Sequence, residues 1–572
     1  MKLQVVFNIN GVLEGFFQGR NGLRQGDPLS PYLFVLSMEV LSSFLKAKLN
    51  SDDSFNFHWR TKPLQLSHVI FADDIFLFCK GESNSIRLLL DSVLQFSGVS
   101  GLQLNKEKCL GFFSCVPNNV ISHTLNHYGF QLGSLPISYL GLPLITSRLN
   151  ESICAPLIQR LSRKVESWTV RHLRYSGRLQ LIKTVLQGIQ SYWSLYLFLP
   201  VGVLKRIQSI LARFLWAGDL HSSCHYKVAW ADCCFIREEG GLGLRDLFDW
   251  NKAAILFQVW RLAHPNPSSI WLLWVHSCML KRKHFWTTKI PYKCPWNLRK
   301  ILNHRREALR FISCKVMAGS SFKFWYDPWL ISVPLIERFG DGIISVMDSS
   351  HEATVGSAIV NGYWAVSSSN DFRATQIRSL ISSCSIARQD AVVNLRVIWE
   401  SIRRRGPSSP WIPLIWSKFN IPSCSFISWL ACRNRLSTKD RLFNIQQVVD
   451  PLCCLCRSNA ESAEHLFTSC PYTYLVLRAC PFDLFINWNA WMLGNFFTDA
   501  LTNFQKQMAF LYITTAIYSI WKERNRRIHD DSSMSVDNII RLVKRMFREK
   551  LFSCPEFRRK VHVEPHLSQL LF

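Results

Sequence analysis

The sequence predicts an α+β fold, with short strands near the amino terminus and helices over most of the remaining chain. The runs HVIFA and IFLFC are short and rich in β-branched and aromatic residues, which is typical of strands, and they flank Asp73 and Asp74. Later segments carry apolar residues at helical spacing. The chain has 572 residues, of which 48% are hydrophobic and 19% are charged, so we expect a globular protein of several domains.

The charge balance favours a polyanionic partner. There are 67 Lys and Arg residues against 40 Asp and Glu, a net charge of +27, which favours nucleic acid over a merely solubilising surface. The first ten residues do not resemble a secretory signal, and no stretch reaches the roughly 20 apolar residues of a membrane span. An odd total of 19 cysteines indicates free or metal-bound thiols. We therefore expect an intracellular protein, nuclear or cytoplasmic, with no membrane partner.

The paired aspartates carry the first chemical signal. Two strands that meet at a tight turn would place Asp73 and Asp74 at the tip of a hairpin, buried on both faces along its strands and open toward a cleft at its tip. Adjacent carboxylates repel each other unless a cation neutralises them, and Mg²⁺ prefers such oxygen ligands. An ordinary Asp-rich turn is the alternative when these residues are considered alone.

The order of the surrounding motifs strengthens the functional interpretation. Upstream lies GRNGLRQGDPLSPYLFVLSMEVLSSFL, a loop that leads into a helix beginning near Ser30. Downstream lie FSGVSGLQLNKEKC and ISYLGLPL. The motifs RQGDPLSP, FADD, Gly-Leu-x-x-Asn-x-x-Lys and YLG occur in this order before residue 145. This arrangement closely resembles the palm of reverse transcriptases from plant-like LINE-type retrotransposons, which lack long terminal repeats.

The resemblance implies an RNA-directed DNA polymerase that uses two Mg²⁺ ions, an RNA template, a DNA primer or target and deoxynucleotides. Asp73 would bind the metal and Asp74 would support it. The other residues that the resemblance implies for the nucleotide and template are Arg24, Gln25, Gly26 and Lys108, with Arg24 and Asp27 shaping the loop. The primer grip would consist of Tyr139, Leu140 and Gly141. For Lys108 the alternative is a merely solvated side chain, which is common for a lysine in a polar loop.

One departure from the family pattern affects the expected activity. The family places another metal-binding Asp on a strand before the RQGDPLSP loop, and fingers before that strand. Residues 1–18 contain no Asp, and Glu14 is their only acidic residue. We therefore expect residues 1–145 to form a truncated palm without fingers or the first catalytic strand. We also expect the isolated chain to be inactive, because a site that lacks one carboxylate cannot hold both metals.

The middle of the chain is basic. Between Arg160 and Lys183 there are seven Lys or Arg residues and one Glu, with a turn expected at Ser176 and Gly177. This pattern suits either a solvated helical face or a thumb that tracks a duplex backbone, which we place at 146–218. We expect a basic connection at 219–344, with a glycine turn at 240–243, and a linker at 345–390. Within the connection, four aromatic residues could stack on bases or fill a core: Phe285, Trp286, Tyr292 and Trp296.

A second cluster has the spacing of a zinc site. Cys453, Cys456, His465 and Cys470 follow the pattern Cys-x2-Cys-x8-His-x4-Cys, and Cys454 could replace Cys453. A helix that begins near Ala463 would bring the last two ligands together. Scattered reduced thiols are the alternative.

The segment also resembles the zinc-binding module that follows the reverse transcriptase in plant LINE-type proteins. The resemblance implies a structural Zn²⁺ with no open position, in a module at 391–480 that is followed by a basic helical tail at 481–572. We expect this module to bind template RNA or target DNA through five cations: Lys418, Arg433, Arg435, Lys439 and Arg441.

Two functions follow from these observations. The first is a reverse transcriptase fragment of a retrotransposon that lacks long terminal repeats. The second is a non-catalytic zinc protein, derived from such an element, that binds RNA or DNA.

Overall fold

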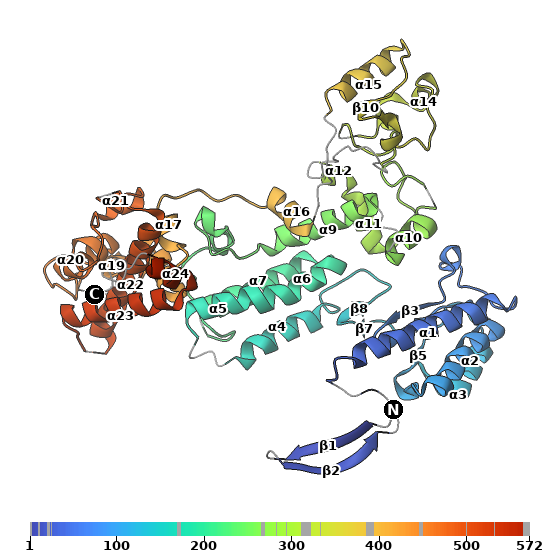
Figure 1. The fold of residues 1–572 in the computed structure, drawn as a ribbon, viewed down its shortest axis with the longest axis horizontal. Helices are drawn as coiled ribbons and strands as arrows, with labels where there is room; N and C mark the ends of the chain where they lie inside the picture. Colours follow the sequence, from blue (N-terminus) through green and yellow to red (C-terminus); the bar gives the residue numbers. More distant parts are fainter. Residues whose placement is uncertain are drawn as a thin grey trace. The chain divides into compact units, whose positions relative to one another are not determined.

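The structure is a computed structural model that describes the chain except for residues 1–2, 10–11, 20–22, 24–25, 169–172, 223, 265–268, 282, 293, 310–321, 332, 385–393, 445–449, 499, 531 and 564–572. The chain divides into two compact units, and each is described by itself (Figure 1). The first unit comprises residues 1–148 and 256–392, and the second comprises residues 149–255 and 393–572.

The first unit opens with hairpins and helices. Its strands form antiparallel pairs β1–β2, β3–β4, β7–β8 and β9–β10 and the parallel pair β5–β6. The elements up to residue 144 are β1 (Leu3–Ile9), β2 (Val12–Gly19), α1 (Ser30–Asn50), η1 (Lys62–Leu64), β3 (His68–Phe71), β4 (Asp74–Leu77), α2 (Ser83–Ser100), η2 (Lys106–Lys108), β5 (Leu110–Gly111), α3 (Asn118–Tyr128), β6 (Gln131–Leu132), β7 (Ile137–Tyr139) and β8 (Leu142–Leu144).

Helices α1 and α2 pack against one face of the β3–β4 hairpin. Leu41 and Leu45 of α1 and Leu89 of α2 are almost fully buried. Ile75 and Leu77 of β4 join this core because alternate residues of a strand point to the same side. The start of α1 at Ser30 confirms the helix expected there.

The remainder of the first unit is built around tryptophans. It comprises α10 (Ile270–Trp274), η6 (Val275–Met279), α11 (Trp296–Asn303), α12 (Arg305–Ala308), α13 (Leu335–Phe339), α14 (Ile343–Val346), η7 (Gly356–Ala358), β9 (Ile359–Val360), β10 (Tyr363–Trp364) and α15 (Phe372–Ser382), together with the end of α9 (Leu247–Ala263). Trp325, Ile343 and Ile377 lie in one buried core. Of the segment expected as a linker at 345–390, residues 345–382 are folded, since widely spaced apolar residues among Ser and Gly converge on Trp325, and residues 385–390 lie outside the described residues.

The aromatic residues of the basic connection differ in burial, which separates core packing from a possible role in stacking on bases. Phe285 and Trp286 are buried, and their carbonyl groups accept hydrogen bonds from the Arg305 guanidinium. Tyr292 is 92% exposed. Phe285 and Trp286 therefore belong to the core, whereas the Tyr292 ring is accessible at the surface for stacking on a base.

The second unit is helical. Its elements are α4 (Ala155–Ser167), α5 (Tyr175–Leu181), η4 (Ile182–Leu186), α6 (Gln187–Tyr196), α7 (Val201–Trp216), α8 (Trp230–Cys233), η5 (Arg237–Glu239), most of α9, α16 (Leu395–Ile402), α17 (Ile412–Ile415), α18 (Pro422–Cys432), α19 (Lys439–Asn444), η8 (His465–Ser469), α20 (Pro471–Arg478), α21 (Trp488–Met492), α22 (Asn503–His529), α23 (Val536–Ser553) and α24 (Pro555–Val563). The turn expected at Ser176 and Gly177 was wrong, because both residues lie in the first turn of α5.

Helix α22 is the centre of the carboxy-terminal part. It begins with a capping box formed by Thr502 and Gln505, and α17, α18 and α23 pack around it. From Met508 to Ile520 every residue is buried, so this part of the helix is enclosed on all sides. Helix α23 does bury one stripe, at Ile539, Val543, Phe547 and Leu551.

Small sheets combined with many helices confirm the α+β class. Among the described helices, none is both long enough and apolar enough to cross a lipid bilayer.

Candidate functional site

The paired aspartates lie at the tip of the β3–β4 hairpin. Phe71 pairs with Asp74, so Ala72 and Asp73 form the two-residue turn that connects the strands. Both carboxylates are exposed, as the tip position predicts. The expectation that the strands are buried on both faces was wrong, since Phe71 is 57% exposed and only the face toward α1 and α2 joins the core.

The turn holds a strained residue. Ala72 has φ +51°, a left-handed conformation that costs a residue with a Cβ roughly 1–2 kcal/mol. Below the turn, His68 anchors β3, because its Nε2 lies 2.8 Å from the Ser42 hydroxyl of α1. Burial, with a smaller contribution from Lys46, lowers the pKa of His68. The helix that follows the RQGDPLSP loop therefore fixes the hairpin that carries the carboxylates.

A second hairpin, β7–β8, lies beside the first. The ring of Tyr139 packs edge to face against Phe76 of β4, with 4.6 Å between the ring centroids. Burial and the Asp74 carboxylate raise the pKa of Tyr139. Leu140 and Gly141 form the turn, with φ of +50° and +76°, which is the two-residue geometry that matches strand twist. The structure thus brings the expected primer grip next to the expected metal ligands, although their roles remain predictions.

The loop before α1 is described only in part. Arg24 and Gln25 lie outside the described residues. Gly26 has φ +87°, and no atom lies within 4 Å of a Cβ built there, so its backbone conformation rather than crowding favours glycine. Asp27 shapes the entry to α1, since its carboxylate accepts a hydrogen bond of 2.8 Å from the Leu29 amide.

The Gly-Leu-x-x-Asn-x-x-Lys motif has a largely structural explanation. Gly101 ends α2 with φ +76°. Leu102 and Leu104 pack against the core of α1 and α2. Asn105 caps η2 by accepting a hydrogen bond from the Lys108 amide. The Lys108 side chain is exposed, and no hydrogen bond or ion pair of the described residues ties it to the aspartates.

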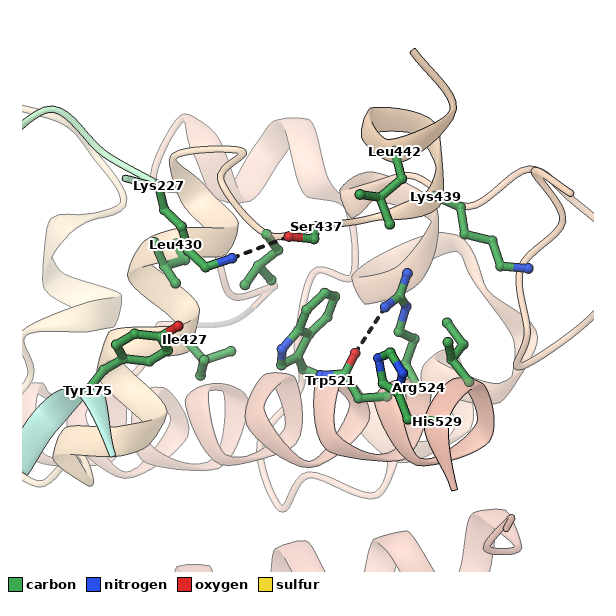
Figure 2. Close-up of a pocket in the computed structure, with 13 residues that line it drawn as sticks. Tyr175, Lys227, Ile427, Leu430, Ser437, Lys439, Leu442, Trp521, Arg524 and His529 are labelled. Carbon is green, nitrogen blue, oxygen red and sulfur yellow. Dashed lines mark hydrogen bonds between the residues drawn. The ribbon is translucent and has the colours of Figure 1, made fainter. Parts of the chain in front are cut away.

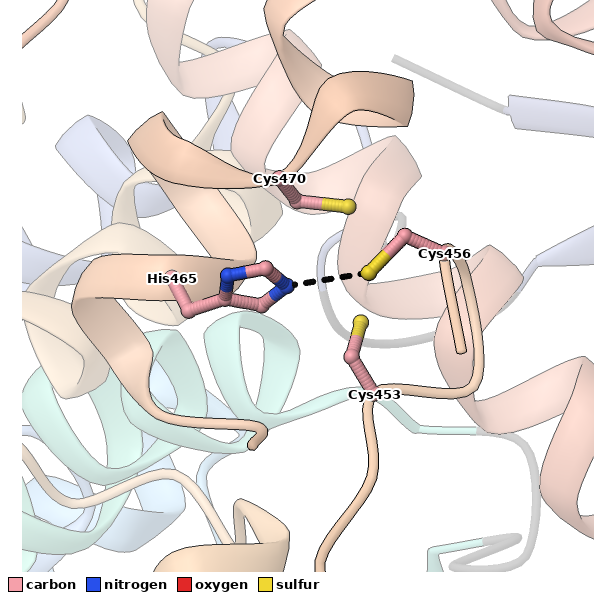
Figure 3. A group of neighbouring side chains, drawn as sticks. All are labelled: Cys453, Cys456, His465 and Cys470. Carbon is pink, nitrogen blue, oxygen red and sulfur yellow. Dashed lines mark hydrogen bonds between the residues drawn. The ribbon is translucent and has the colours of Figure 1, made fainter. Parts of the chain in front are cut away.

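The four zinc-ligand candidates meet in space. One ligand atom from each of Cys453, Cys456, His465 and Cys470 lies within 4.8 Å of all the others (Figure 3). The Cys456 sulfur lies 3.3 Å from Nε2 of His465. A tetrahedral site with Zn–S near 2.3 Å and Zn–N near 2.05 Å separates such atoms by about 3.6 Å. Three thiols and one imidazole at this spacing fit a closed Zn²⁺ site.

Local structure explains how these ligands converge. A helix begins at Ala463, as expected, and its π-helical turn η8 is closed by a 2.7 Å hydrogen bond from the Cys470 amide to the His465 carbonyl. Cys470 then caps α20. A hydrogen bond from Cys453, supported by the amides of Thr473 and Tyr472, lowers the pKa of Cys470, and a thiolate is the form that binds metal.

Helix α22 supports the zinc loop. The Arg527 guanidinium donates hydrogen bonds of 3.2 Å to the carbonyl groups of Cys454 and Leu455. Glu523 is fully buried and accepts a hydrogen bond of 2.9 Å from Arg527. One turn away, Arg524 donates a hydrogen bond of 2.8 Å to the fully buried Glu461. Buried charges need such partners, and groups that orient a metal loop contribute to metal affinity.

The alternative ligand Cys454 points away from the cluster. Its sulfur lies 3.7 Å from the Arg524 carbonyl, toward α22. Burial and the Glu461 carboxylate raise the pKa of Cys454 to about 11, which keeps it a thiol at neutral pH. Cys453, rather than Cys454, is therefore the fourth member of the cluster.

The five cations expected to hold nucleic acid differ in their availability. Lys418 pairs with Glu556, and Arg433 binds Asp232 and the Gly240 carbonyl. Gly240 is part of the turn at 240–243, as expected, with φ +72°. The other three are Lys439, which pairs with Asp450, Arg441, which donates to the Leu436 carbonyl, and Arg435, which is exposed.

The sequence did not identify three residues that support the two sites. Phe76 read as one more strand residue, and Glu523 and Arg527 read as part of a charged helix. No local signal distinguishes them, because their partners are distant in sequence.

Two protein families match parts of the chain. Residues 2–144 match the family described as reverse transcriptase (RNA-dependent DNA polymerase), and residues 394–476 match the family described as zinc-binding in reverse transcriptase. The chain carries a reverse transcriptase domain and a reverse transcriptase zinc-binding domain. The resemblance found in the sequence is confirmed.

The relatives are retrotransposon and plant proteins. A putative ribonuclease H protein of Arabidopsis thaliana is 21% identical over 58% of this chain and 56% of its own length. A retrovirus-related Pol polyprotein from a type-2 retrotransposable element of Drosophila melanogaster is 28% identical over 40% of this chain and 21% of its length. A similar polyprotein of Popillia japonica is 25% identical over 39% of this chain and 36% of its length. The chain thus spans about half or less of each of these relatives.

Proposed function

We propose that the chain contributes the palm of an RNA-directed DNA polymerase of a retrotransposon without long terminal repeats, and that it acts on an RNA template, a DNA primer and deoxynucleotides. The single observation that supports this most strongly is the pair of exposed carboxylates, Asp73 and Asp74, at the tip of a hairpin on which Tyr139 packs through Phe76. Bound Mg²⁺ would activate the primer hydroxyl and neutralise the leaving pyrophosphate. In this proposal Asp73 binds the metal, Asp74 supports it, and Tyr139 to Gly141 position the primer end.

The side chains of helix α4 support a thumb role for residues 146–218, the segment that follows the palm. Leu157, Leu161 and Val165 are buried, while Arg160, Arg163 and Lys164 are exposed. A helix that is anchored on one side and cationic on the other suits a nucleic-acid backbone. The zinc-binding domain would supply further binding surface, with its metal in a structural role.

The 572-residue chain alone is expected to be inactive in nucleotidyl transfer. Two-metal chemistry needs carboxylates that hold both ions. Residues 1–18, which precede the RQGDPLSP loop, contain only one acidic residue, Glu14. The lack of an aspartate in residues 1–18 favours a second candidate function for the isolated chain, a zinc protein that binds RNA or DNA without catalysis.

Primer extension on an RNA template separates the two candidates. We expect no incorporation by the chain alone, and incorporation when a fragment with a further Asp-bearing strand is supplied. In that complemented reaction Asp73→Asn should lower the rate at least about 100-fold, because a metal site stabilises the transition state by several kcal/mol. Asp53→Asn, on an exposed loop, should have no effect. Equal activity of the two variants would contradict the proposal.

A further inference from the structure

A cavity of about 530 Å³ lies in the second unit, outside both sites described above (Figure 2). This volume falls within the range of roughly 300–1,000 Å³ that is typical of small-ligand sites. None of its lining residues is acidic, whereas lysine, arginine and aromatic side chains are present. The 13 lining residues are Tyr175, Lys227, Ile427, Leu430, Leu436, Ser437, Lys439, Leu442, Trp521, Arg524, Asn525, Ile528 and His529.

Two of the cations are neutralised within the protein. The Lys439 ammonium lies 3.0 Å from the Asp450 carboxylate and donates to the Leu452 carbonyl at 2.8 Å. The Arg524 guanidinium binds Glu461. These side chains fix the walls of the cavity and leave little charge for a ligand.

Lys227 differs from both. Its ammonium donates one hydrogen bond of 3.3 Å, to the hydroxyl group of Ser437, and no ion pair links it to a carboxylate among the described residues (Figure 2). The side chain is partly buried, and burial, with a contribution from Arg441, lowers its pKa. A partly desolvated cation without a counter-ion is costly, and an anionic ligand would offset that cost.

Aromatic and apolar side chains form another part of the lining. Trp521 lines the cavity, and the Arg524 guanidinium lies 4.9 Å from its ring centroid. Tyr175 is held by stacking on Phe426, with 5.0 Å between the ring centroids. An indole and an ammonium that has no carboxylate partner among the described residues line the same cavity, which matches a flat ring that is linked to a negative group.

We infer that this cavity binds one nucleotide of a single-stranded nucleic acid, with the base against Trp521 and the phosphate on Lys227 and Ser437. The inference deepens the proposed function, on which it rests for the identity of the partner. It assigns a nucleotide site to the helical unit, distant in sequence from the aspartate hairpin.

Binding of a labelled single strand to the zinc-loaded full chain tests this assignment without Mg²⁺ or deoxynucleotides. Fluorescence anisotropy would be measured over a series of salt concentrations, with RNA and DNA strands in separate arms. Lys227→Gln should reduce the slope of log K against log salt by about 0.7, the value for one phosphate contact on a single strand. Lys522→Gln is the matched control, because Lys522 is exposed on α22, next to Trp521, and does not line the cavity.

The aromatic contact predicts a different signature. Trp521→Leu should weaken binding between about fivefold and 150-fold, as expected for the loss of one stacked base, with no change in the salt slope. If this variant does not fold, photo-cross-linking of a 4-thiouridine strand to the unaltered chain provides a second measurement. Cross-links at Trp521 or Tyr175 would support the site, and cross-links confined to other residues would overturn it.

Three other outcomes would overturn the inference. One is unchanged affinity and salt slope in folded Lys227→Gln and Trp521→Leu chains. Another is equal competition by polyglutamate, which would indicate an acidic peptide instead. The third is a slope change of the same size in Lys522→Gln. Asp73→Asn should leave this binding unchanged, so failure of the nucleotide site and failure of the polymerase proposal are distinguishable.

Discussion

Replacement of Cys453 by serine, compared with the same change at Cys454, tests the metal site at adjacent positions. The Cys453 sulfur lies within 4.8 Å of the other three ligand atoms, whereas the Cys454 sulfur faces the Arg524 carbonyl at 3.7 Å. We expect one zinc per unaltered chain and per Cys454→Ser chain, and loss of zinc from Cys453→Ser after dialysis against a weak chelator.

The expected effect on stability follows from mass action. Free zinc at about 1,000 times its dissociation constant stabilises the folded state by about 4 kcal/mol. The second unit has roughly 290 residues, so its unfolding entropy is about 0.6 kcal/mol/K and each kcal/mol changes Tm by about 1.7 °C. Zinc should therefore raise Tm by about 7 °C relative to the chelated protein. Cys453→Ser should lose this increment, and Cys454→Ser should keep it.

Zinc content by atomic spectrometry and thermal melts with and without chelator provide the measurements. Retention of one zinc by Cys453→Ser would refute the ligand assignment. Loss of zinc from Cys454→Ser would show that the adjacent thiol is the ligand, contrary to its orientation toward α22.

Three further predictions concern an arginine that holds the zinc loop, a buried acid and a turn. Arg527→Ala should weaken zinc binding by about 10-fold to 100-fold in a competition titration, because it removes the donors to the zinc-loop carbonyls. Burial raises the pKa of Asp327 from 3.8 to about 6, so its carboxyl favours folding below pH 3.8 and loses that contribution as the pH rises through 6. Asp327→Asn should therefore gain up to about 3 kcal/mol in chemical denaturation at pH 7, and the gain should vanish near pH 4, since the amide oxygen can still accept from the Lys323 amide. Gly141→Ala should cost about 1–2 kcal/mol at φ +76°, whereas Gly98→Ala, in helix α2 with open space around it, should gain about 0.5–1 kcal/mol.

Much of the candidate site was predictable because it is local. A two-residue turn between β-rich runs fixes Asp73 and Asp74 at a hairpin tip whatever the rest of the chain does. The Cys-x2-Cys pair and the helix from Ala463 bring the zinc ligands close within a segment of 18 residues, from Cys453 to Cys470. The exposure of Phe71 was not predictable, because one face of the hairpin finds no covering helix in the first unit.

The predicted linker shows the limit of composition. Residues 343–382 are rich in Ser and short polar runs, yet Ile343, Val355 and Ile377 converge on Trp325. Each apolar residue is isolated in the sequence, so no window reveals a core. Their convergence depends on contacts between positions tens of residues apart.

The sequence by itself determined the family, the paired carboxylates and a set of metal ligands in which Cys453 and Cys454 were alternatives, because these depend on residue identity at short spacing. Only the tertiary structure decided which thiol joins the cluster, which cations are already paired, and that the cavity lysine Lys227 has no carboxylate partner among the described residues. The physical reason is that burial and charge compensation arise between residues distant in sequence. Lys227 and Ser437 lie 210 positions apart, and no local pattern could have joined them.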